Sequence, residues 1–304
     1  MPTHQRSTSA VVSALPAPIP SPDTQVGYTS TQYNTFAPSY NHVRENPTLY
    51  IESSTLYTAL KPYIQSSRIL DLACGTGYFS RKLLTWGAES VLGVDISEEM
   101  IAVACGTLGM QERGNANKKL VFEVGDARVL GIRGKGGYDL ITAVWLVNYA
   151  RDKEEMREMF AGIAANLKEG GRFVGITLPP VEGKEMGRWK ERMDGVRKGR
   201  VESWGVDMHY RERLENGGWE VVTDGGDGVC FVEFHLPREL FDIAAREAGL
   251  KGVVEWREVS LDEGGCEEVE KLAGREFCRQ YFEGSSSQDL DSLGPHFGLL
   301  VVEK

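Results

Sequence analysis

The sequence is poor in the features that mark several large classes of protein. Its 304 residues hold five cysteines and five histidines, and no two cysteines are spaced as C-x-x-C. We therefore expect no zinc or other metal site and no disulfide framework, and we expect a reducing, cytoplasmic setting. No apolar run reaches the length of a membrane-spanning helix, so no membrane association is predicted.

Clusters of basic residues are also missing, and the formal net charge is −10. A nucleic-acid partner would be repelled by such a chain, whereas a small cationic ligand would not. Residues 1–28 are rich in Ser, Thr and Pro and lack the apolar content that offsets the entropy of ordering, so we expect a disordered tail. Their only arginine is Arg6, and the stretch "VVSALPAPIP" is short and broken by Pro, which argues against a targeting peptide.

From about residue 66, short apolar runs alternate with amphipathic stretches. The pattern predicts helices at 77–87, 97–109 and 152–168, the last starting at an N-cap Asp152 and stopping at Gly170. Alternation of this kind produces right-handed crossovers and a parallel sheet with helices on both faces, which is an α/β fold. The predicted strands are 68–73, 90–95, 119–124, 138–144 and 171–178.

The alternation breaks after residue 180. The turn sequences "ENGG" and "DGGDG" separate β-rich runs and predict an antiparallel meander inserted into the sheet domain. The remaining predicted elements are a helix at 237–248, a strand at 252–260, a helix at about 265–282, a last strand at 297–304, and two N-terminal helices within 33–47 and 48–64. The chain then divides into a tail (1–28), N-terminal helices (29–66), a core (67–180), an inserted cap (181–236) and the end of the core (237–304).

The stretch "ILDLACGTGYFSRKLLTWGAESVLGVDIS", residues 69–97, carries the chemistry. A dinucleotide fingerprint would place a third glycine where Ser80 stands, and Asp71 at the mouth of the first strand would repel a pyrophosphate. Asp71 would instead stabilise a cation, or only cap the turn. A nucleoside with a positive tail fits, and adenosylmethionine carries an ammonium and a sulfonium.

Acids also end the next two predicted strands. Asp95 can accept hydrogen bonds from both ribose hydroxyls, because Ser97 is the better cap for the helix that follows. Asp126 can accept from the adenine amino group, or it is a solvated loop acid.

Five segments in order resemble the class I adenosylmethionine-dependent methyltransferases: "LDLACGTGYFS", "VLGVDIS", "VGDA", "YDLITAVWLVNYA" and "NLKEGGRFVGI". The resemblance covers about residues 30 to 180 and, more loosely, the end of the chain. "YNTFAPSYN" and "WLVNYA" look most like the small-molecule branch that includes toxin-A-type and glycine N-methyltransferase-like enzymes. The resemblance implies a Rossmann-like, mostly parallel seven-stranded sheet with its last strand antiparallel, N-terminal lid helices, and S-adenosyl-L-methionine as cofactor.

The resemblance also implies which residues hold the cofactor. They are Asp71, Ala73, Gly75 and Gly77 for the methionine part, Asp95 and Ile96 for the ribose with Met100 nearby, Asp126 and Ala127 at the adenine, and Val144 and Trp145 beneath the sulfonium. Cys74 departs from the more common Gly or Pro, and we expect its thiol to be inert packing.

Tyr33 and Tyr40 lie seven residues apart, which is one helical face. They are either core tyrosines or, by the resemblance, part of a lid with Tyr33 near the methyl donor. Arg44 is then either a partner of the methionine carboxylate or a surface residue. Asn148 and Tyr149 follow the fourth strand, where open α/β sheets bind ligands, so we expect them to contact substrate.

The meander holds His209 and His235, each a candidate base for a phenol or alcohol or else an ordinary strand residue. Its aromatic residues suit a flat or apolar substrate, although strand alternation means that about half of these side chains should point toward solvent or the core instead. They are Trp204, Tyr210, Trp219, Phe231 and Phe234, and Phe231 is our predicted substrate contact.

We predict an enzyme that transfers a methyl group to a nitrogen or oxygen atom of a small molecule in secondary or specialised metabolism. Much of the rate of such a reaction can come from positioning, so no catalytic triad is required. "AVWLVNYA" lacks the Asn/Asp-Pro-Pro-aromatic signature of amino-methylating nucleic-acid enzymes. The alternatives are a regulator that binds adenosylmethionine without turnover and a nicotinamide-dependent dehydrogenase. The oligomeric state is open.

Overall fold

The fold is described from a computed structural model. It describes residues 31–34, 40, 47–107, 119–133, 137–194, 207–225, 229–257, 259, 261, 269–271 and 297–304. The predicted tail, Arg44, Trp204 and most of the predicted helix at 265–282 lie outside these residues.

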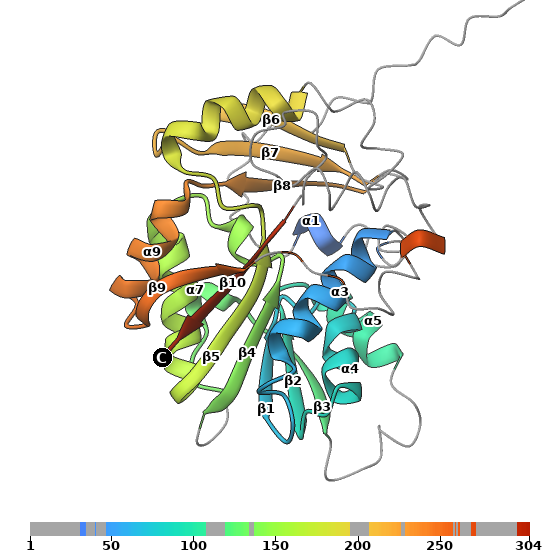
Figure 1. The fold of residues 1–304 in the computed structure, drawn as a ribbon. Coiled ribbons are helices and arrows are strands. Elements are labelled where there is room, and N and C mark those ends of the chain that lie inside the picture. The colour runs from blue at the N-terminus through green and yellow to red at the C-terminus, as the bar shows by residue number, and fades with distance from the viewer. Residues whose placement is uncertain are drawn as a thin grey trace, which may run out of the picture.

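A seven-stranded sheet forms the centre of the molecule, in the order β3-β2-β1-β4-β5-β10-β9 (Figure 1). Its strands are β1 (Arg68–Leu72), β2 (Ser90–Asp95), β3 (Leu120–Val124), β4 (Tyr138–Val144), β5 (Leu167–Thr177), β9 (Lys251–Arg257) and β10 (Gly298–Glu303). β1 to β5 pair in parallel, and β10 runs antiparallel to both β5 and β9. The predicted Rossmann-like sheet with an antiparallel last strand is confirmed.

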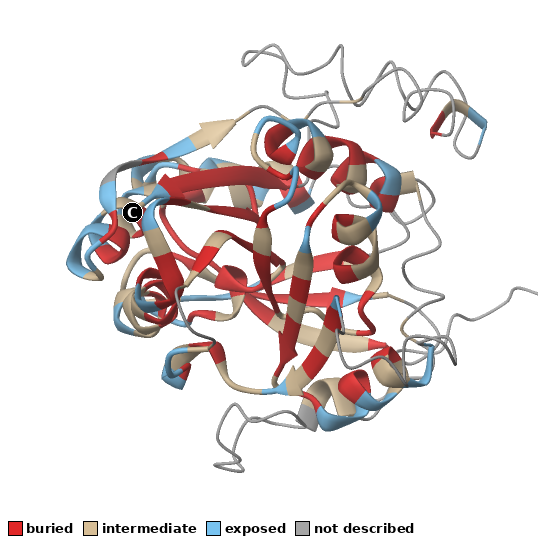
Figure 2. Ribbon diagram, turned by 90° about the horizontal axis from the view of Figure 1, so that it is seen from below, coloured by how far each residue is buried: buried red, intermediate tan, exposed pale blue. Residues whose placement is uncertain are grey.

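Helices cover both faces of this sheet because its strands alternate their side chains between two apolar clusters. Ile69 of β1 packs in the cluster on the side of α3 (Pro47–Leu60), α4 (Tyr78–Thr85) and α5 (Glu98–Gly106). Its neighbour Leu70 packs in the cluster on the side of α7 (Lys153–Asn166) and α9 (Arg238–Glu247). Figure 2 shows buried strands in the middle, with exposed residues on the outer sides of the helices.

Two predicted helix starts are confirmed, and one predicted helix end is wrong. Ser97 accepts a hydrogen bond from Met100 N, and Asp152 accepts from Glu154 N and Glu155 N. α7 ends at Asn166, four residues before Gly170, because Leu167 is already extended and pairs with Tyr138 of β4. Strand pairing therefore stops the helix, and Gly170 lies within β5 with φ +73°.

A second, three-stranded antiparallel sheet, which we call the cap sheet, lies between β5 and α9 in the sequence. Its strands are β6 (Asp207–Arg213), β7 (Trp219–Asp224) and β8 (Cys230–His235). The short helix α1 (Thr31–Asn34) contacts β8 and α5, so it lies between the cap sheet and the main sheet (Figure 1). The antiparallel meander expected from the turn sequences is present.

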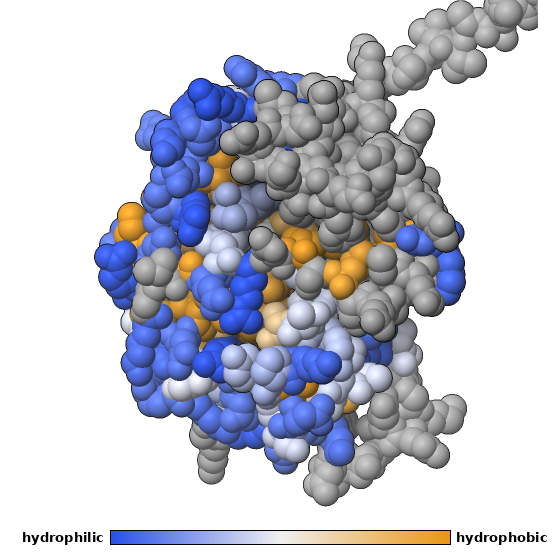
Figure 3. Space-filling model, viewed as in Figure 1, coloured by the Kyte–Doolittle hydropathy of each residue, from blue (hydrophilic) through white to orange (hydrophobic). Residues whose placement is uncertain are grey.

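None of the described helices combines the length and the apolar character needed to span a bilayer. On the face drawn in Figure 3, hydrophilic residues cover the outer parts and hydrophobic residues show in the middle.

Candidate active site

The carboxylate of Asp71 lies inside the molecule, where it joins three elements. It is 1% exposed and accepts hydrogen bonds from Ser80 Oγ of α4 at 2.5 Å and from Thr142 Oγ1 of β4 at 2.8 Å. Ser80 stands where a dinucleotide-binding loop would have glycine, and it has a definite partner here. Asp71 thus fixes the start of the loop that follows β1.

That loop has an unusual backbone. Ala73, Gly75 and Gly77 have φ of 53°, 53° and 80°, the left-handed region that favours glycine. A Cβ on Gly77 would lie 2.5 Å from Cζ of Phe122, whereas no described atom lies within 4 Å of a Cβ on Gly75. Gly77 is therefore required by packing, and the Gly75 backbone can be approached closely by a ligand.

These two glycines give a matched prediction. Gly77→Ala should lower the melting temperature clearly, because left-handed strain of about 1–2 kcal/mol adds to a clash with a ring. Gly75→Ala carries the strain without the clash, so its main effect should be weaker cofactor binding. Thermal melting and calorimetry on both variants measure this. A Gly75→Ala protein that binds as tightly as wild type would show that no ligand reaches this backbone.

Asp95, the last residue of β2, holds the loop to the next helix. Its Oδ2 accepts from Gly75 N at 2.8 Å, and its Oδ1 accepts from Ser97 N at 2.9 Å. Burial raises the pKa of Asp95, against which backbone hydrogen bonds from Ser97, Gly75 and Ile96 act. Each carboxylate oxygen has two lone pairs, so both can still accept from a ribose hydroxyl.

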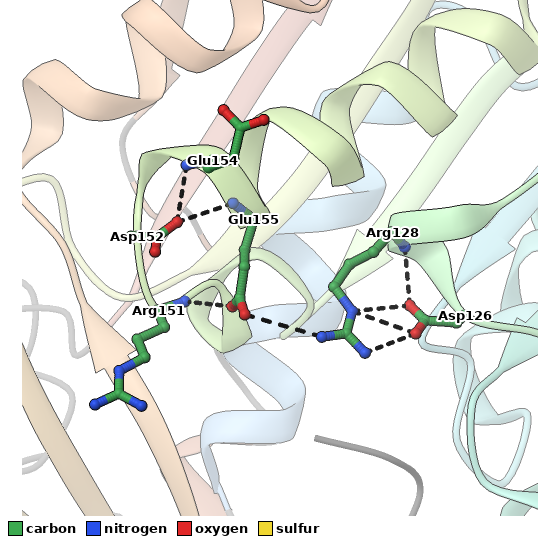
Figure 4. Close-up of polar contacts among 6 residues, drawn as sticks. All are labelled: Asp126, Arg128, Arg151, Asp152, Glu154 and Glu155. Carbon is green, nitrogen blue, oxygen red and sulfur yellow. Dashed lines mark hydrogen bonds and ion pairs between the residues drawn. The ribbon is translucent and has the colours of Figure 1, made fainter. Parts of the chain in front are cut away.

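Asp126 is engaged with a neighbouring cation. Its carboxylate accepts from Arg128 N at 2.9 Å and from Arg128 Nη2 at 2.7 Å, and Arg128 reaches Glu155 of α7 at 3.9 Å (Figure 4). The side chain of Asp126 is 23% exposed, and Ala127 beside it is buried. If Asp126 also accepts a hydrogen bond from the adenine amino group, as the resemblance implies, its carboxylate must bind adenine and Arg128 at the same time.

The chain after β4 turns sharply at Trp145, whose φ is +63°. Such a conformation is costly for a large residue and is typical of functional sites. Trp145 Nε1 donates to Glu52 Oε1 of α3 at 2.9 Å, and Val144 before it is buried. This turn leads into the short helix η2 (Val147–Tyr149), which holds the predicted substrate residues.

Three of the four predicted substrate residues, Tyr40, Tyr149 and Phe231, meet around Tyr33. The hydroxyl of Tyr33 is hydrogen-bonded to that of Tyr149, and its ring centroid lies 5.8 Å from Tyr40, 5.9 Å from Tyr149 and 5.9 Å from Phe231. We call these four rings the aromatic cluster. Met100, only 1% exposed, packs against Tyr33, Tyr40 and Phe231, which joins the cluster to α5.

Consecutive residues of α1 bind different elements. Gln32 Oε1 accepts from Val232 N of β8 at 3.3 Å, and Asn34 Oδ1 accepts from Ser97 Oγ at 2.6 Å. With Tyr33 bound to Tyr149 between them, α1 connects the cap sheet, η2 and the start of α5. Of the predicted lid, α1 and Tyr40 lie within the described residues, and Arg44 does not.

His235 and His209 lie on opposite faces of the cap sheet. His235 is buried, its Nδ1 lies 2.8 Å from the Tyr210 hydroxyl and its Nε2 lies 2.8 Å from Pro179 O. Burial lowers the pKa of His235 to about 4, so the ring is neutral with both nitrogens engaged. His209 pairs with Asp207 at 3.1 Å and shares its sheet face with Val222. Neither histidine lies in the aromatic cluster.

Sequence reasoning missed Glu233. It is 2% exposed and accepts from Asn148 Nδ2 of η2 at 2.7 Å. Phe231, Glu233 and His235 alternate along β8 and therefore share one face. The sequence feature that could have identified this residue is that Glu233 is the single acid in the segment "FVEFH", at a position that faces inward.

Cys74 agrees with the expectation of inert packing. Burial raises the pKa of its thiol well above the ordinary value, with Asp95 and Asp71 adding to the shift. Among the described residues, no three His, Cys, Asp or Glu side chains gather as they would around a metal ion.

The chemistry of this sheet edge fits the expected cofactor. Asp71, Asp95 and Asp126 lie at or just beyond the carboxyl ends of three adjacent strands, and the open backbone of Gly75 is hydrogen-bonded to Asp95. Carboxylates suit ribose hydroxyls and a cationic tail, and they oppose a pyrophosphate.

Comparison with known proteins agrees with this reading. Residues 69–171 match a family described as "Methyltransferase domain". A putative methyltransferase, YqeM of Bacillus subtilis, is 35% identical over 108 residues, which cover 35% of this chain and 40% of that protein. An S-adenosylmethionine-dependent methyltransferase from Mesorhizobium loti has a similar structure, with 21% identity, a TM-score of 0.50 and coverage of 82% of this chain and 95% of that one.

Further relatives have diverse names. The DhpI–SAM–HEP complex superposes with a TM-score of 0.55 at 15% identity and covers 90% of this chain and 94% of its own. Ribosomal protein L11 methyltransferase of Neisseria meningitidis is 33% identical over 144 residues, 47% of this chain and 42% of that protein. An mRNA cap guanine-N(7) methyltransferase of Aspergillus niger matches over 44 residues at 43% identity, 14% of this chain and 7% of that protein.

The chain spans 40%, 59% and 42% of the length of three curated relatives that it matches, which is less than two thirds of each. The similarity to a methyltransferase domain lies in residues 69–171, about a third of the chain, and the sheet agrees with the fold of the solved neighbours. The names of the two solved structures above include S-adenosylmethionine, in one as the cofactor on which the enzyme depends and in the other as a component of the complex. Relatives named for RNA caps and ribosomal proteins leave nucleic-acid and protein substrates open, so the expectation of no nucleic-acid partner is unconfirmed.

Proposed function

We propose that the protein is a methyltransferase that uses S-adenosylmethionine to methylate a nitrogen or oxygen atom of a small molecule. The observation that carries this proposal is Asp95, whose carboxylate is fixed to the backbone of Gly75 next to Ser97. Asp95 would hold the ribose, Gly75 and Gly77 the methionine part, and Val144 and Trp145 the region beneath the sulfonium. The cofactor supplies an electrophilic methyl group when bound, and the chain positions its acceptor.

The cap sheet and α1 support a small substrate. β8 contacts η2, which follows β4, and α1 contacts α5, which follows β2, so both lie beside the strand ends where predicted site residues gather. A small acceptor can be enclosed there, whereas a folded RNA or protein would need an open approach. We propose residues 181–236 as the unit that selects the substrate, and Tyr40, Asn148, Tyr149 and Phe231 as substrate contacts.

Neither histidine is retained as the base in this proposal. Both ring nitrogens of His235 are already engaged by Tyr210 and Pro179. His209 faces the other side of the cap sheet and pairs with Asp207. Tyr33 stays in the proposal as a positioning residue, because its hydroxyl joins Tyr149 next to the substrate contacts.

A ligand-binding experiment tests the cofactor. S-adenosylmethionine and S-adenosylhomocysteine should raise the melting temperature, because each binds the folded state, which stabilises it by about 2.7 kcal/mol at 100 times Kd. NAD and ATP should not. Equal stabilisation by NAD would favour a dehydrogenase and contradict the proposal.

Turnover is tested separately with labelled S-adenosylmethionine against amines, phenols and carboxylic acids, with RNA and ribosomal protein as further acceptors. We expect label in a small-molecule product. Cofactor binding without turnover on any acceptor would favour a regulator instead, and label in RNA or protein alone would refute the small-molecule assignment.

A further inference from the structure

Glu233 is a buried acid that the proposed cofactor site does not use. Its Oε1 accepts from Thr223 Oγ1 of β7 at 2.5 Å, and its Oε2 accepts from Asn148 Nδ2 at 2.7 Å. In register, Glu233 pairs with Val221, and Thr223 pairs with Phe231, so all four share one face of the cap sheet. This face meets η2, and it brings Glu233 next to the aromatic cluster.

Asn148 has a buried oxygen that faces away from this pair. The Nδ2 of Asn148 donates to Glu233 Oε2, so its Oδ1 points elsewhere. Asn148 is 1% exposed, and within the described residues Oδ1 has no hydrogen-bond donor. A buried acceptor in this state is costly, which indicates that a donor is supplied by something that binds there.

The surroundings of Glu233 lack a positive charge in the described part of the chain. Burial raises the pKa of Glu233 to about 7, against hydrogen bonds from Thr223 and Asn148. The Glu233 charge acts on the hydroxyls of Tyr33 and Tyr149, both of whose pKa values burial raises well above the ordinary value. His235, next but one on the same strand face, is neutral because burial lowers its pKa to about 4. Of the described residues, Glu233 acts on Tyr33 and Tyr149, and Asp95 also acts on Tyr33, so both carboxylates favour a cation at this place.

The aromatic cluster beside this pair also favours a cation. The faces of Tyr and Phe rings attract an ammonium group, and more strongly where water is excluded. Tyr33 contacts Tyr40, Tyr149 and Phe231 within 5.9 Å between ring centroids. Met100 and Val229, both buried, complete an apolar lining.

We propose that Glu233 and Asn148, with the aromatic cluster, form the substrate site for an apolar amine that arrives as its ammonium ion. The inference rests on the proposed methyltransferase function and names its substrate class. One ammonium N–H donates to Asn148 Oδ1 and another faces Glu233. Glu233 accepts a proton, so that an N–H bond breaks, an O–H bond forms, and the electron pair stays on the nitrogen. The neutral amine is then the nucleophile, and Glu233 later returns its proton to water.

An alcohol or a carboxylic acid fits these groups less well. A neutral hydroxyl gains no charge attraction from Glu233, and a carboxylate would be repelled by it. An amine has both the charge for Glu233 and the N–H donor for Asn148. The net charge of −10 acts in the same direction on the approach of a cation.

Calorimetry tests the inference with three probes of one shape: 2-phenylethylamine, 2-phenylethanol and phenylacetate. Wild-type protein is first titrated with S-adenosylhomocysteine, and the saturated protein is then titrated with each probe. The amine should bind about tenfold more tightly than the alcohol, because one charged hydrogen bond separates the two. Phenylacetate should not bind, because its carboxylate is repelled by Glu233. Amine affinity should fall below about pH 7 as Glu233 takes up its proton, by the same factor that removal of the Glu233 charge costs, and should level off above that pH.

Glu233→Gln keeps the volume and removes the charge. It should weaken amine binding about tenfold or more, abolish its pH dependence and leave S-adenosylhomocysteine affinity within about twofold. Glu220→Gln is the matched control, since Glu220 lies on β7 and pairs with Phe234, on the opposite face of the cap sheet. Glu220→Gln should change neither the affinity for the amine nor the affinity for S-adenosylhomocysteine. Melting temperatures of both variants establish that they are folded.

Several results would overturn the inference. They are no amine binding by the saturated wild type, an alcohol that binds as tightly as the amine, or an unchanged Glu233→Gln protein. In each case intact S-adenosylhomocysteine binding would leave the methyltransferase proposal standing. If S-adenosylhomocysteine itself fails to bind, the proposed function is what fails.

Discussion

Asp95→Asn should weaken the binding of S-adenosylmethionine about ten- to 150-fold, the equivalent of about 1.5–3 kcal/mol. The carboxylate accepts from Gly75 N and Ser97 N with separate oxygens. An amide in its place has only one accepting oxygen, and its NH₂ group would confront one of the two backbone N–H groups. The variant therefore loses a ribose acceptor and loosens the loop. Isothermal calorimetry with S-adenosylhomocysteine measures the effect.

The matched control for this variant is Glu98→Gln. Glu98 is an exposed acid in the first turn of α5, three residues after Asp95, so the same charge is removed close by. Its affinity should stay near that of wild type. If Asp95→Asn changes the affinity for S-adenosylhomocysteine less than threefold, the ribose is held elsewhere. If Glu98→Gln loses as much affinity as Asp95→Asn, the loss is explained by the change in net charge alone.

Asp71→Ala should lower the free energy of unfolding by about 2–4 kcal/mol. The substitution leaves Ser80 Oγ and Thr142 Oγ1 without their common acceptor and opens space where β1, β4 and α4 meet. Because Asp71 lies behind the loop and is 1% exposed, the loss should show in stability before it shows in ligand affinity. Urea unfolding without ligand measures the effect.

Asp139→Ala serves for comparison, since it removes an acid from β4 that is 38% exposed and ion-paired with Lys168 at 2.6 Å. A half-exposed pair of this kind contributes about 0–1 kcal/mol. If Asp71→Ala costs no more than Asp139→Ala, the buried carboxylate is not what organises the loop. Thr142→Val should fall between the two, because it removes one of the Asp71 hydrogen bonds.

The central sheet was predictable from the sequence because its strands are buried on both faces. Strands predicted at 90–95 and 138–144 agree with β2 and β4 residue for residue, since a strand in such a sheet is a continuous apolar run. The end of α7 was not predictable from a glycine, because the pairing of Leu167 with Tyr138 decides it. Local signals found the elements, and tertiary pairing set their limits.

The candidate site divides in the same way. Asp71, Asp95 and Asp126 each follow an apolar run, so their place at the sheet edge could be read from the sequence. Asp126 and Arg128, which form an ion pair, are only two residues apart, so this contact could also have been predicted from the sequence. Glu233 and Asn148 are 85 residues apart, and only the docking of β8 on η2 brings them together.

The contacts of α1 imply an order in which parts of the protein fold. Gln32 meets Val232 across 200 residues, Tyr33 meets Tyr149 across 116, and Asn34 meets Ser97 across 63. Contacts between residues so far apart in the sequence form slowly, because a long loop must close, at a cost in entropy, before these contacts can stabilise the protein. During synthesis α1 leaves the ribosome before each of these three partners, and it can complete these contacts only after β8 has been made. The aromatic cluster should therefore be among the last parts to consolidate in refolding, after the central sheet has formed.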